Sequence, residues 1–452
     1  MRIHFIAIGG SAMHNLAIAL KKKGYQVTGS DDAIFEPSSS RLERYGLLPE
    51  QMGWDQNRIN SSLDAVILGM HALVDNPELL KAQELGLRIY SYPEYIYEQT
   101  KDKLRVVIGG SHGKTTITSM ILHVLNFYRK DFDYLVGAQL AGFDTMVKIT
   151  DSAPVMIIEG DEYLSSPIDR RPKFHLYQAN IAVISGIAWD HINVFPTYEE
   201  YVRQFKIFIE TITADGTLIY CTEDTDLAEI ADAATSMVEK IGYAAHPHEI
   251  RDGITYLLPD HTPLEVFGEH NLMNLNAAKN VCRKLDISSG QFDEAISSFT
   301  GAARRLEVVY SKDETIVYKD FAHSPSKLKA TISAVKIQYP LRKLIACIEL
   351  HTFSSLNKNF LSQYKDTMSQ ADYATVFIDK KTFEHKKMPP FSESDVQTAF
   401  NDEKIKFFND IALLETYLRQ FNYRSSNLLM MTSGNFSGLD LINLARELNT
   451  SK

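Results

Sequence analysis

Val106-Val107-Ile108-Gly109-Gly110-Ser111-His112-Gly113-Lys114-Thr115-Thr116 is the stretch of this sequence that decides its fold. Its apolar start predicts a buried strand, and its glycines predict a tight turn into a helix that begins near Lys114. Backbone N–H groups of such a loop bind phosphate oxygens, the lysine neutralises the β and γ phosphates, and a threonine hydroxyl can bind Mg²⁺. The stretch therefore predicts a nucleoside triphosphate site. Its predicted nucleotide-binding residues are Gly110, Ser111, His112, Gly113, Lys114, Thr115 and Thr116.

The glycine spacing departs from the common eight-residue phosphate-loop pattern. Ile108 stands where the first glycine of that pattern would be, and Gly109 and Gly110 close the loop instead. The alternative is an ordinary turn between a strand and a helix, with Lys114 exposed to solvent. The full order of strand, glycine loop, Lys-Thr and helix favours the phosphate loop.

Length and composition set the frame around this loop. The chain has 452 residues, which predicts about three domains. Its content of 44% hydrophobic and 23% charged residues is typical of a soluble globular protein. A net charge of −10 argues against a nucleic-acid partner, and no apolar run is long enough to span a membrane, so we expect a cytoplasmic protein. The three cysteines are far apart and predict neither a metal site nor a disulfide framework.

Three α/β units follow one another along the chain, with predicted domains at 1–103, 104–302 and 303–452. The first opens with a strand at 3–8, a glycine turn and a helix at 12–23, and the charged segment 99–103 is the expected linker. The first unit predicts a mononucleotide-type βαβ half, and the second predicts a phosphate-loop domain with a mostly parallel sheet. Further predicted strands are 65–68, 155–158, 181–185, 315–319, 343–348, 375–378 and 427–431, and predicted C-terminal helices are 326–336 and 439–448.

Charged side chains follow two strands of the predicted central sheet. Glu159, Asp161 and Glu162 come after the strand at 155–158, and Asp190 and His191 follow the next strand. Clustered carboxylates repel one another unless a cation lies among them, although a solvated acidic loop is an equal alternative. Because the carboxyl ends of parallel strands meet at one edge, we expect both groups near the phosphate loop.

Two later clusters carry groups that suit a nucleotide. His270, Asn271 and Asn274 open an alanine-rich helix, and their amides offer donors and acceptors to adenine, or simply cap the helix. Arg304 and Arg305 lie at the junction of the second and third units, where they would clamp a γ-phosphate or form a surface ion pair.

Taken in order, these motifs resemble the signatures of the Mur ligase family over essentially the whole chain. The resemblance implies a Rossmann-like first domain that binds a UDP-muramoyl substrate, a central phosphate-loop ATPase, and a Rossmann-like C-terminal domain that brings the amine donor. The motifs that carry it are 110–116, 159–162, Asp190-His191, 270–274 and Arg304-Arg305-Leu306-Glu307.

The resemblance also implies roles for individual residues, with ATP and Mg²⁺ as cofactors and an acyl phosphate as the intermediate. The implied catalytic residues are Lys114, His191, Arg305 and His323. The implied metal ligands are Thr115, Glu159 and His191. Besides the loop, nucleotide binding is assigned to His270, Asn271, Asn274, Arg304, Arg305 and Asp320. UDP-substrate binding is assigned to Gly9, Gly10, Ser11, Met13, Ser30 and Asp31.

The amine donor is predicted from finer similarities within the family. The segments 9–13, 28–31 and 320–325 resemble the branch that acts on UDP-N-acetylmuramate itself. Within that branch, 161–163 and 169–174 resemble the recycling form, which predicts the tripeptide L-Ala-γ-D-Glu-meso-diaminopimelate as donor. The alternative is L-alanine, as in peptidoglycan synthesis.

Several departures bear on the donor. The chain has Lys319-Asp320 and His323-Ser324 where the branch usually has paired aspartates and paired histidines. Residues that discriminate between donors are expected after Glu307. Polar candidates there are His351, Ser433 and Asn435, and the alternative is that they belong to ordinary strand-end turns.

Two other classes of protein remain as alternatives. A nicotinamide-dependent oxidoreductase is suggested by the opening βαβ unit and by Asp31, but the first turn lacks the three-glycine spacing and Lys114 would have no role. A non-catalytic nucleotide-binding regulator would not need Lys114, Thr115, Glu159 and His191 together.

Overall fold

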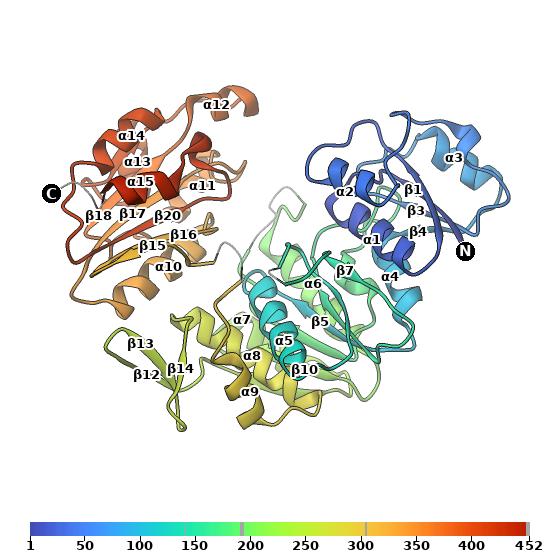
Figure 1. Cartoon of the computed structure of the whole chain (residues 1–452), viewed down its shortest axis with the longest axis horizontal. Helices are drawn as coiled ribbons and strands as arrows, with labels where there is room; N and C mark the ends of the chain where they lie inside the picture. The colour runs from blue at the N-terminus through green and yellow to red at the C-terminus, as the bar shows by residue number, and fades with distance from the viewer. Residues whose placement is uncertain (141, 190–193, 303–304, 449–452) are drawn as a thin grey trace. The chain divides into compact units, whose positions relative to one another are not determined.

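The computed structural model describes residues 1–140, 142–189, 194–302 and 305–448, and these contain four β-sheets. The chain forms two compact units, which are Met1–Ala244 with Met273–Ile296, and Ala245–Leu272 with Ser297–Lys452 (Figure 1). Helices and mostly parallel strands alternate through both units, which confirms the predicted α/β class.

A four-stranded parallel sheet opens the first unit, in the order β2-β1-β3-β4. Strand β3 is buried at all four positions, as expected for an apolar strand covered on both faces. The predicted strand 3–8 ends earlier, at Ile6, because Ala7 takes a left-handed φ of 66° and begins the glycine turn. The strands are β1 (Arg2–Ile6), β2 (Gln26–Ser30), β3 (Ala65–Leu68) and β4 (Ile89–Ser91), and the helices are α1 (Ser11–Lys22), α2 (Ser38–Arg44), α3 (Pro77–Glu84) and α4 (Tyr92–Thr100).

The second sheet of this unit has seven strands in the order β11-β10-β9-β5-β8-β6-β7, and β7 is its one antiparallel strand. Strand β5 lies between β8 and β9 and is parallel to both. The loop after β5 therefore emerges between the carboxyl ends of two neighbouring strands, where open α/β sheets bind ligands. The strands are β5 (Leu104–Gly109), β6 (Asp133–Leu135), β7 (Val147–Lys148), β8 (Val155–Glu159), β9 (Ile181–Ile184), β10 (Thr217–Cys221) and β11 (Glu239–Tyr243).

Helices accompany this sheet along the chain. Helix α5 follows the glycine loop directly, and most of its residues are buried, because its sequence is apolar around most of its circumference. The helices are α5 (Lys114–Phe127), α6 (Tyr198–Glu210), α7 (Thr225–Ala233), α8 (Glu269–Lys284) and α9 (Ser289–Ile296), with short 3₁₀ turns at Gln56–Arg58 and Lys173–Leu176.

A small antiparallel sheet, β12-β13-β14, belongs to the second unit and was not predicted from the sequence. Asp252 and Gly253 join its first two strands with φ angles of 53° and 76°. Positive φ at both central residues is the geometry of a two-residue hairpin turn, for which Asp-Gly is a preferred sequence. The strands are β12 (His248–Arg251), β13 (Ile254–Leu257) and β14 (Thr262–Leu264).

The C-terminal sheet has six strands in the order β15-β16-β20-β17-β18-β19, and only the edge strand β15 is antiparallel. The strands are β15 (Glu307–Lys312), β16 (Thr315–Asp320), β17 (Lys343–Glu349), β18 (Tyr373–Phe377), β19 (Lys406–Phe408) and β20 (Ser426–Met431). The helices are α10 (Pro325–Gln338), α11 (Lys358–Leu361), α12 (Lys380–Lys386), α13 (Glu393–Phe400), α14 (Ile411–Leu418) and α15 (Leu441–Leu448), with short 3₁₀ turns at Ser362–Tyr364 and Phe436–Gly438.

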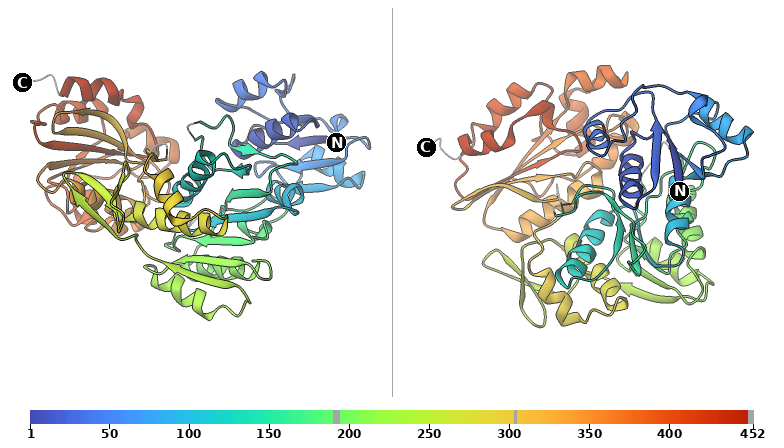
Figure 2. Two further views of the ribbon diagram at one scale, coloured as in Figure 1. Left: turned by 60° about the horizontal axis from the view of Figure 1, so that its bottom comes forward. Right: turned by 45° about the vertical axis from the view of Figure 1, so that its right-hand side comes forward.

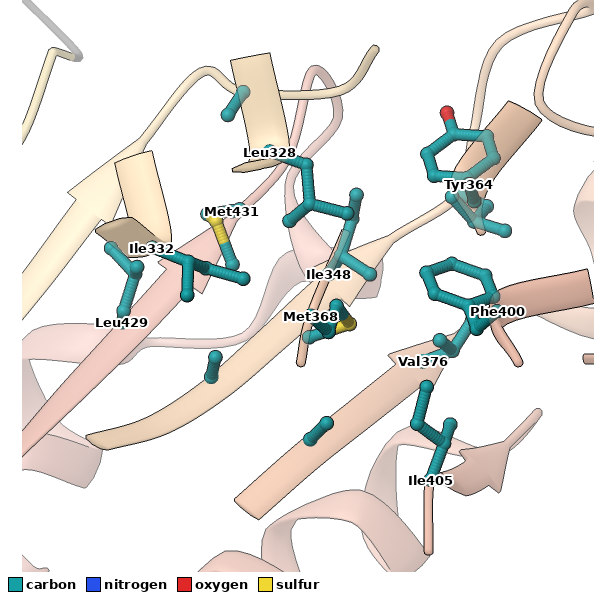
Figure 3. Packing of buried hydrophobic residues seen from close by; sticks show 14 of the residues in the cluster. Leu328, Ile332, Ile348, Tyr364, Met368, Val376, Phe400, Ile405, Leu429 and Met431 are labelled. Carbon is teal, nitrogen blue, oxygen red and sulfur yellow. The ribbon is translucent and has the colours of Figure 1, made fainter. Parts of the chain in front are cut away.

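Helices cover both faces of this sheet, as the further views in Figure 2 also show. Figure 3 shows Leu328 and Ile332 of α10 beside Ile348 and Met431 in the core of one face. Side chains of alternate strand residues, such as Cys347, pack with α14 and α15 on the other face. This two-sided burial explains why the strands are apolar at nearly every position.

None of the helices in the described ranges combines the length and apolarity needed to cross a bilayer. The predicted domain boundaries at 103 and 302 stay predictions.

Candidate active site

The loop between β5 and α5 has the backbone that the sequence predicts. Gly110 and Gly113 take φ angles of 124° and 77°, which L side chains rarely adopt, and Gly113 caps the amino end of α5. The first turn of a helix leaves N–H donors without intrahelical partners, and its dipole favours an anion there. The loop therefore has the form of a phosphate-binding turn.

Neighbouring strand ends hold this loop tightly. A β-carbon at Gly110 would collide with the side chain of Ser185, whose hydroxyl donates to the carbonyl of His112. The Ser111 N–H donates to the carbonyl of Gly186 at 2.9 Å. The Ser111 hydroxyl is buried and has no hydrogen-bond partner among the described residues. A buried orphan hydroxyl beside free helix N–H groups fits a phosphate oxygen.

The Lys114 ammonium lies beside two oxygen acceptors. It donates to the carbonyl of Gly110 at 2.5 Å and to Oε2 of Glu162 at 2.7 Å. Glu162 is 1% exposed, and its other carboxylate oxygen accepts a hydrogen bond from the Tyr201 hydroxyl at 3.3 Å. Burial alone would lower the pKa of Lys114, but the nearby carboxylates, chiefly Glu162, outweigh burial and raise that pKa. The lysine is therefore charged.

Glu159 and Thr115 form an oxygen pair at the end of β8. The Thr115 hydroxyl donates to Oε1 of Glu159 at 2.7 Å, and the Gly137 N–H donates to Oε2 at 2.8 Å. A carboxylate beside a threonine hydroxyl at a phosphate loop has the hard oxygen donors that Mg²⁺ prefers. Among the described residues, no group of three or more His, Cys, Asp or Glu side chains is arranged to hold a metal. The predicted ligand His191, with Asp190, lies outside the described residues.

A cavity of 440 Å³ opens between the glycine turn of the first sheet and the phosphate loop. Gly10, Ser11 and Met13 line it together with Lys114 and Glu159. Predicted UDP-substrate residues and predicted phosphate and metal residues thus face the same space. A substrate bound along the glycine turn would have its reacting end near the phosphate loop.

The other three predicted UDP-substrate residues are Gly9, Ser30 and Asp31, and they make hydrogen bonds around the first sheet. The Asp31 carboxylate accepts hydrogen bonds from the N–H of Gly9 at 2.7 Å and of Asp32 at 3.0 Å, and burial raises its pKa to about 6. The buried Ser30 hydroxyl donates to Glu78. These contacts shape the glycine turn, and a direct role in UDP binding stays a prediction.

The predicted adenine-binding residues are divided between the two compact units. Asn274 lies in the same compact unit as the phosphate loop, and a β-carbon at Gly113 would collide with its side-chain oxygen. Asn271 belongs to the other unit and donates to the carbonyl of Phe267 at 2.8 Å. Burial, with the charge of Arg305, lowers the pKa of His270 to about 4, so this imidazole is neutral at neutral pH.

Arg305, Asp320 and His323 come together near the end of β16 in the second unit. Asp320 is buried and accepts the N–H groups of Leu306 and Ala322, each at 2.7 Å, and burial raises its pKa. The Arg305 guanidinium lies 5.0 Å from the centre of the Phe321 ring. His323 Nδ1 is 2.8 Å from the Phe321 carbonyl oxygen. Arg304 lies outside the described residues.

Sequence analysis did not predict every part of the site. Glu162 was predicted only as one carboxylate of a cluster. Its pairing with Lys114 was not predicted, because the two residues lie 48 positions apart in the sequence. Ser185 and Gly137 were not singled out at all. Ser185 is the last residue of the predicted strand 181–185, and this strand-end position is the sequence signal that would have found it.

The fold and site together define a phosphate-loop nucleotide-binding α/β protein. Residues 2–103 match the family model described as "Mur ligase family, catalytic domain", and residues 108–282 match the "Mur ligase middle domain". A UDP-N-acetylmuramate–L-alanine ligase from Desulforamulus reducens is 30% identical over an alignment of 389 residues, which covers 82% of this chain and 81% of that protein. The chain belongs to the Mur ligase family, the ATP-dependent amide-bond ligases of peptidoglycan metabolism.

Solved structures agree on the fold over the full length. A UDP-N-acetylmuramate–alanine ligase from Thermotoga maritima aligns with a TM-score of 0.69 and 20% identity, covering 100% of both chains. A murein peptide ligase from Psychrobacter arcticus aligns with a TM-score of 0.62 and 21% identity, covering 100% of this chain and 99% of that one. Family membership supports the ligase interpretation over the oxidoreductase and the non-catalytic regulator.

Proposed function

We propose that this protein joins the lactyl carboxylate of UDP-N-acetylmuramate to the amine of L-alanine, with conversion of ATP to ADP and phosphate. The observation that carries the proposal is the single cavity lined by Ser11 and Met13 on one side and by Lys114 and Glu159 on the other. The donor is proposed from the relatives of at least 30% identity, which are named UDP-N-acetylmuramate–L-alanine ligases. L-Alanine thus replaces the tripeptide, which the sequence favoured, as the first candidate.

The proposed chemistry follows from the poor reactivity of a carboxylate. One carboxylate oxygen attacks the γ-phosphorus of ATP, ADP leaves, and an acyl phosphate forms. The amine then attacks the carbonyl carbon, loses a proton, and expels phosphate, which keeps the attacking oxygen. Lys114 would stabilise charge on the transferring phosphoryl group, because its ammonium already lies at the loop among acidic groups.

Mg²⁺ is the proposed metal, and Thr115 and Glu159 are the described residues that would hold it. When bound, the ion would neutralise phosphate charge and orient the γ-phosphoryl group. His191 is proposed as a further ligand from the family resemblance. For the nucleotide, Asn274 is the proposed adenine-side residue of the first unit, because it lies against Gly113.

The tripeptide remains a second candidate donor because of one structural feature. Asp161, Ser165 and Lys173 line the substrate cavity, and Lys173 binds Asp161 at 2.5 Å. Asp161 and Lys173 belong to the segments 161–163 and 169–174, which resemble the peptide-ligating branch. A cationic side chain at this cavity would suit a donor that carries several carboxylates.

A donor competition separates the two candidates. The protein is incubated with ATP, Mg²⁺ and UDP-N-acetylmuramate plus equal concentrations of L-alanine and the tripeptide, and products are identified by mass. We expect UDP-N-acetylmuramoyl-L-alanine as the main product. Exclusive formation of the tripeptide product would reject L-alanine and keep the ligase. No amide product with either donor, and no phosphate release that depends on UDP-N-acetylmuramate, would reject the proposal.

A further inference from the structure

Asn15 in helix α1 is a fully buried polar residue whose amide makes contacts at both of its ends. Its Nδ2 donates to the carbonyl of Ser11 at 2.9 Å. Its Oδ1 accepts the backbone N–H of Met146 at 3.0 Å and Nη1 of Arg41 at 3.3 Å. The contact with Met146 joins residues 131 positions apart, so a helix of the first sheet holds the β6–β7 hairpin of the second.

Further hydrogen bonds connect the hairpin to the residues beside the phosphate loop. The carbonyl of Met146 accepts the N–H of Val136 at 2.9 Å. The next residue, Gly137, donates its N–H to Oε2 of Glu159, and the other oxygen of that carboxylate accepts the hydroxyl of Thr115. A continuous path of short contacts therefore runs from the Asn15 amide to the proposed metal ligands.

We propose that Asn15 is a positioning residue that orients the Glu159 carboxylate for the metal through Met146 and Gly137. This inference rests on the proposed function, because it assigns Glu159 to the metal. Asn15 lies one turn after Ser11, which lines the cavity, so the helix that follows the predicted UDP-binding turn also sets the geometry of the metal site.

The physical reason is the cost of an unpaired buried N–H. Met146 is 8% exposed, and loss of its acceptor would leave its backbone N–H unsatisfied or force the hairpin to shift. A shift of Val136 would carry the Gly137 N–H away from Glu159. Residues that orient a metal ligand in this way typically change metal affinity by about 10–100-fold when they are removed.

The test compares Asn15→Leu, which removes the acceptor, with Asn15→Asp, which keeps it. The matched control is Asn280→Leu, because Asn280 also donates from Nδ2 to a carbonyl one helical turn earlier, at 2.9 Å, but does not contact the hairpin. Binding of Mn²⁺ to the ADP-saturated protein is measured by electron paramagnetic resonance. Binding of UDP-N-acetylmuramate without nucleotide is measured by calorimetry, and melting temperature is recorded for each variant.

We expect Asn15→Leu to weaken Mn²⁺ binding about tenfold. The affinity for UDP-N-acetylmuramate should change less than threefold, and Asn15→Asp and the control should bind Mn²⁺ like the wild type. If Asn15→Leu does not fold, Arg41→Leu, which removes another donor to Oδ1, takes its place with a smaller weakening of about threefold expected.

Equal Mn²⁺ affinity in the wild type and Asn15→Leu would overturn the inference. So would an equal loss of Mn²⁺ and UDP-N-acetylmuramate binding, because that pattern means loss of packing only. Failure of the wild type itself to bind Mn²⁺ with ADP would instead remove the metal assignment in the proposed function, and the inference with it.

Discussion

The phosphate loop in the first unit and the end of β16 in the second unit both gather charged residues, but they use them differently. At the phosphate loop, Lys114 and Glu159 line a cavity and are held by side chains and a glycine N–H from other elements. At the end of β16, Asp320 binds backbone N–H groups of its own unit, and Arg305 lies over the ring of Phe321.

The difference teaches how a charged residue near a strand end is to be interpreted. A lysine that pairs with a carboxylate at a cavity can bind a phosphate in place of that carboxylate. Its ammonium group then stays buried and paired with an anion in both states. A carboxylate that satisfies two buried N–H groups is required by the fold whether or not a ligand binds. Substitutions should therefore affect rate at the first place and stability at the second.

The largest effect is expected for Lys114→Ala. The turnover number should fall by about 10²–10³, because one preorganised charge is lost from the phosphoryl-transfer site. The melting temperature is recorded in parallel, because the variant also leaves the buried Glu162 carboxylate without its ammonium partner. The measurement is phosphate release with saturating ATP and UDP-N-acetylmuramate.

Lys279→Ala is the matched control for this variant. Lys279 is 12% exposed and pairs with Asp293 at 2.9 Å, whereas Lys114 is 17% exposed, but Lys279 lies on helix α8 and does not line the cavity. The control should keep wild-type turnover. Equal activity in both variants would contradict a catalytic phosphate loop.

Glu159→Ala should have the next largest effect, on metal dependence. We expect the Mg²⁺ concentration for half-maximal phosphate release to rise at least about tenfold, because a carboxylate ligand is lost. Binding of UDP-N-acetylmuramate, measured by calorimetry, should stay close to that of the wild type. A collapse of UDP-substrate binding with unchanged Mg²⁺ dependence would show that Glu159 belongs to the substrate site.

Asp320→Ala should act on stability. It leaves the N–H groups of Leu306 and Ala322 without their acceptor, which should lower the free energy of unfolding by about 2 kcal/mol. Asp320→Asn keeps an acceptor oxygen and should lose less. Denaturant-induced unfolding of the two variants measures the difference in stability. An Asp320→Ala protein as stable as the wild type would contradict the structural role assigned to Asp320.

The smallest expected effect is the pH dependence contributed by His270. Its pKa is lowered from 6.5 to about 4 in the folded protein, so between these values the unfolded chain binds a proton that the folded chain does not. Folding stability should therefore fall as the pH drops from about 6.5 to 4 and should not depend on this group above 6.5. A shift of this size corresponds to about 3 kcal/mol for a fully buried ring. Because His270 is only partly buried, we expect a contribution on the order of 1–2 kcal/mol.

Nuclear magnetic resonance of the imidazole protons of His270 measures this pKa directly. A midpoint near 6.5 would mean that the ring is solvated rather than buried. His270→Asn, which does not titrate, should lose the same slope of stability against pH.

Local chemistry explains why much of the phosphate loop and sheets could be predicted. A glycine loop between an apolar strand and a helix carries its own signal, and strand β3 was predicted at its observed limits, 65–68. Asp252-Gly253 was an equally local signal for a hairpin that was overlooked, because the strands beside it are short and half-exposed.

Contacts between distant residues could not be predicted in the same way. Nothing in the sequence around Asn15 indicates that its amide binds Met146, because that contact depends on how the first sheet packs on the β6–β7 hairpin. The pairing of Lys114 with Glu162 likewise depends on the neighbouring positions of β5 and β8. The packing of α1 on the hairpin decides the first contact, and strand order decides the second.

Oxygen transfer tests the proposed acyl-phosphate mechanism most directly. UDP-N-acetylmuramate labelled with ¹⁸O in its lactyl carboxylate is converted with ATP, Mg²⁺ and L-alanine, and the released phosphate is analysed by mass. The mechanism predicts one ¹⁸O atom in each phosphate, because the attacking carboxylate oxygen leaves with phosphorus. Amide product accompanied by unlabelled phosphate would contradict the mechanism.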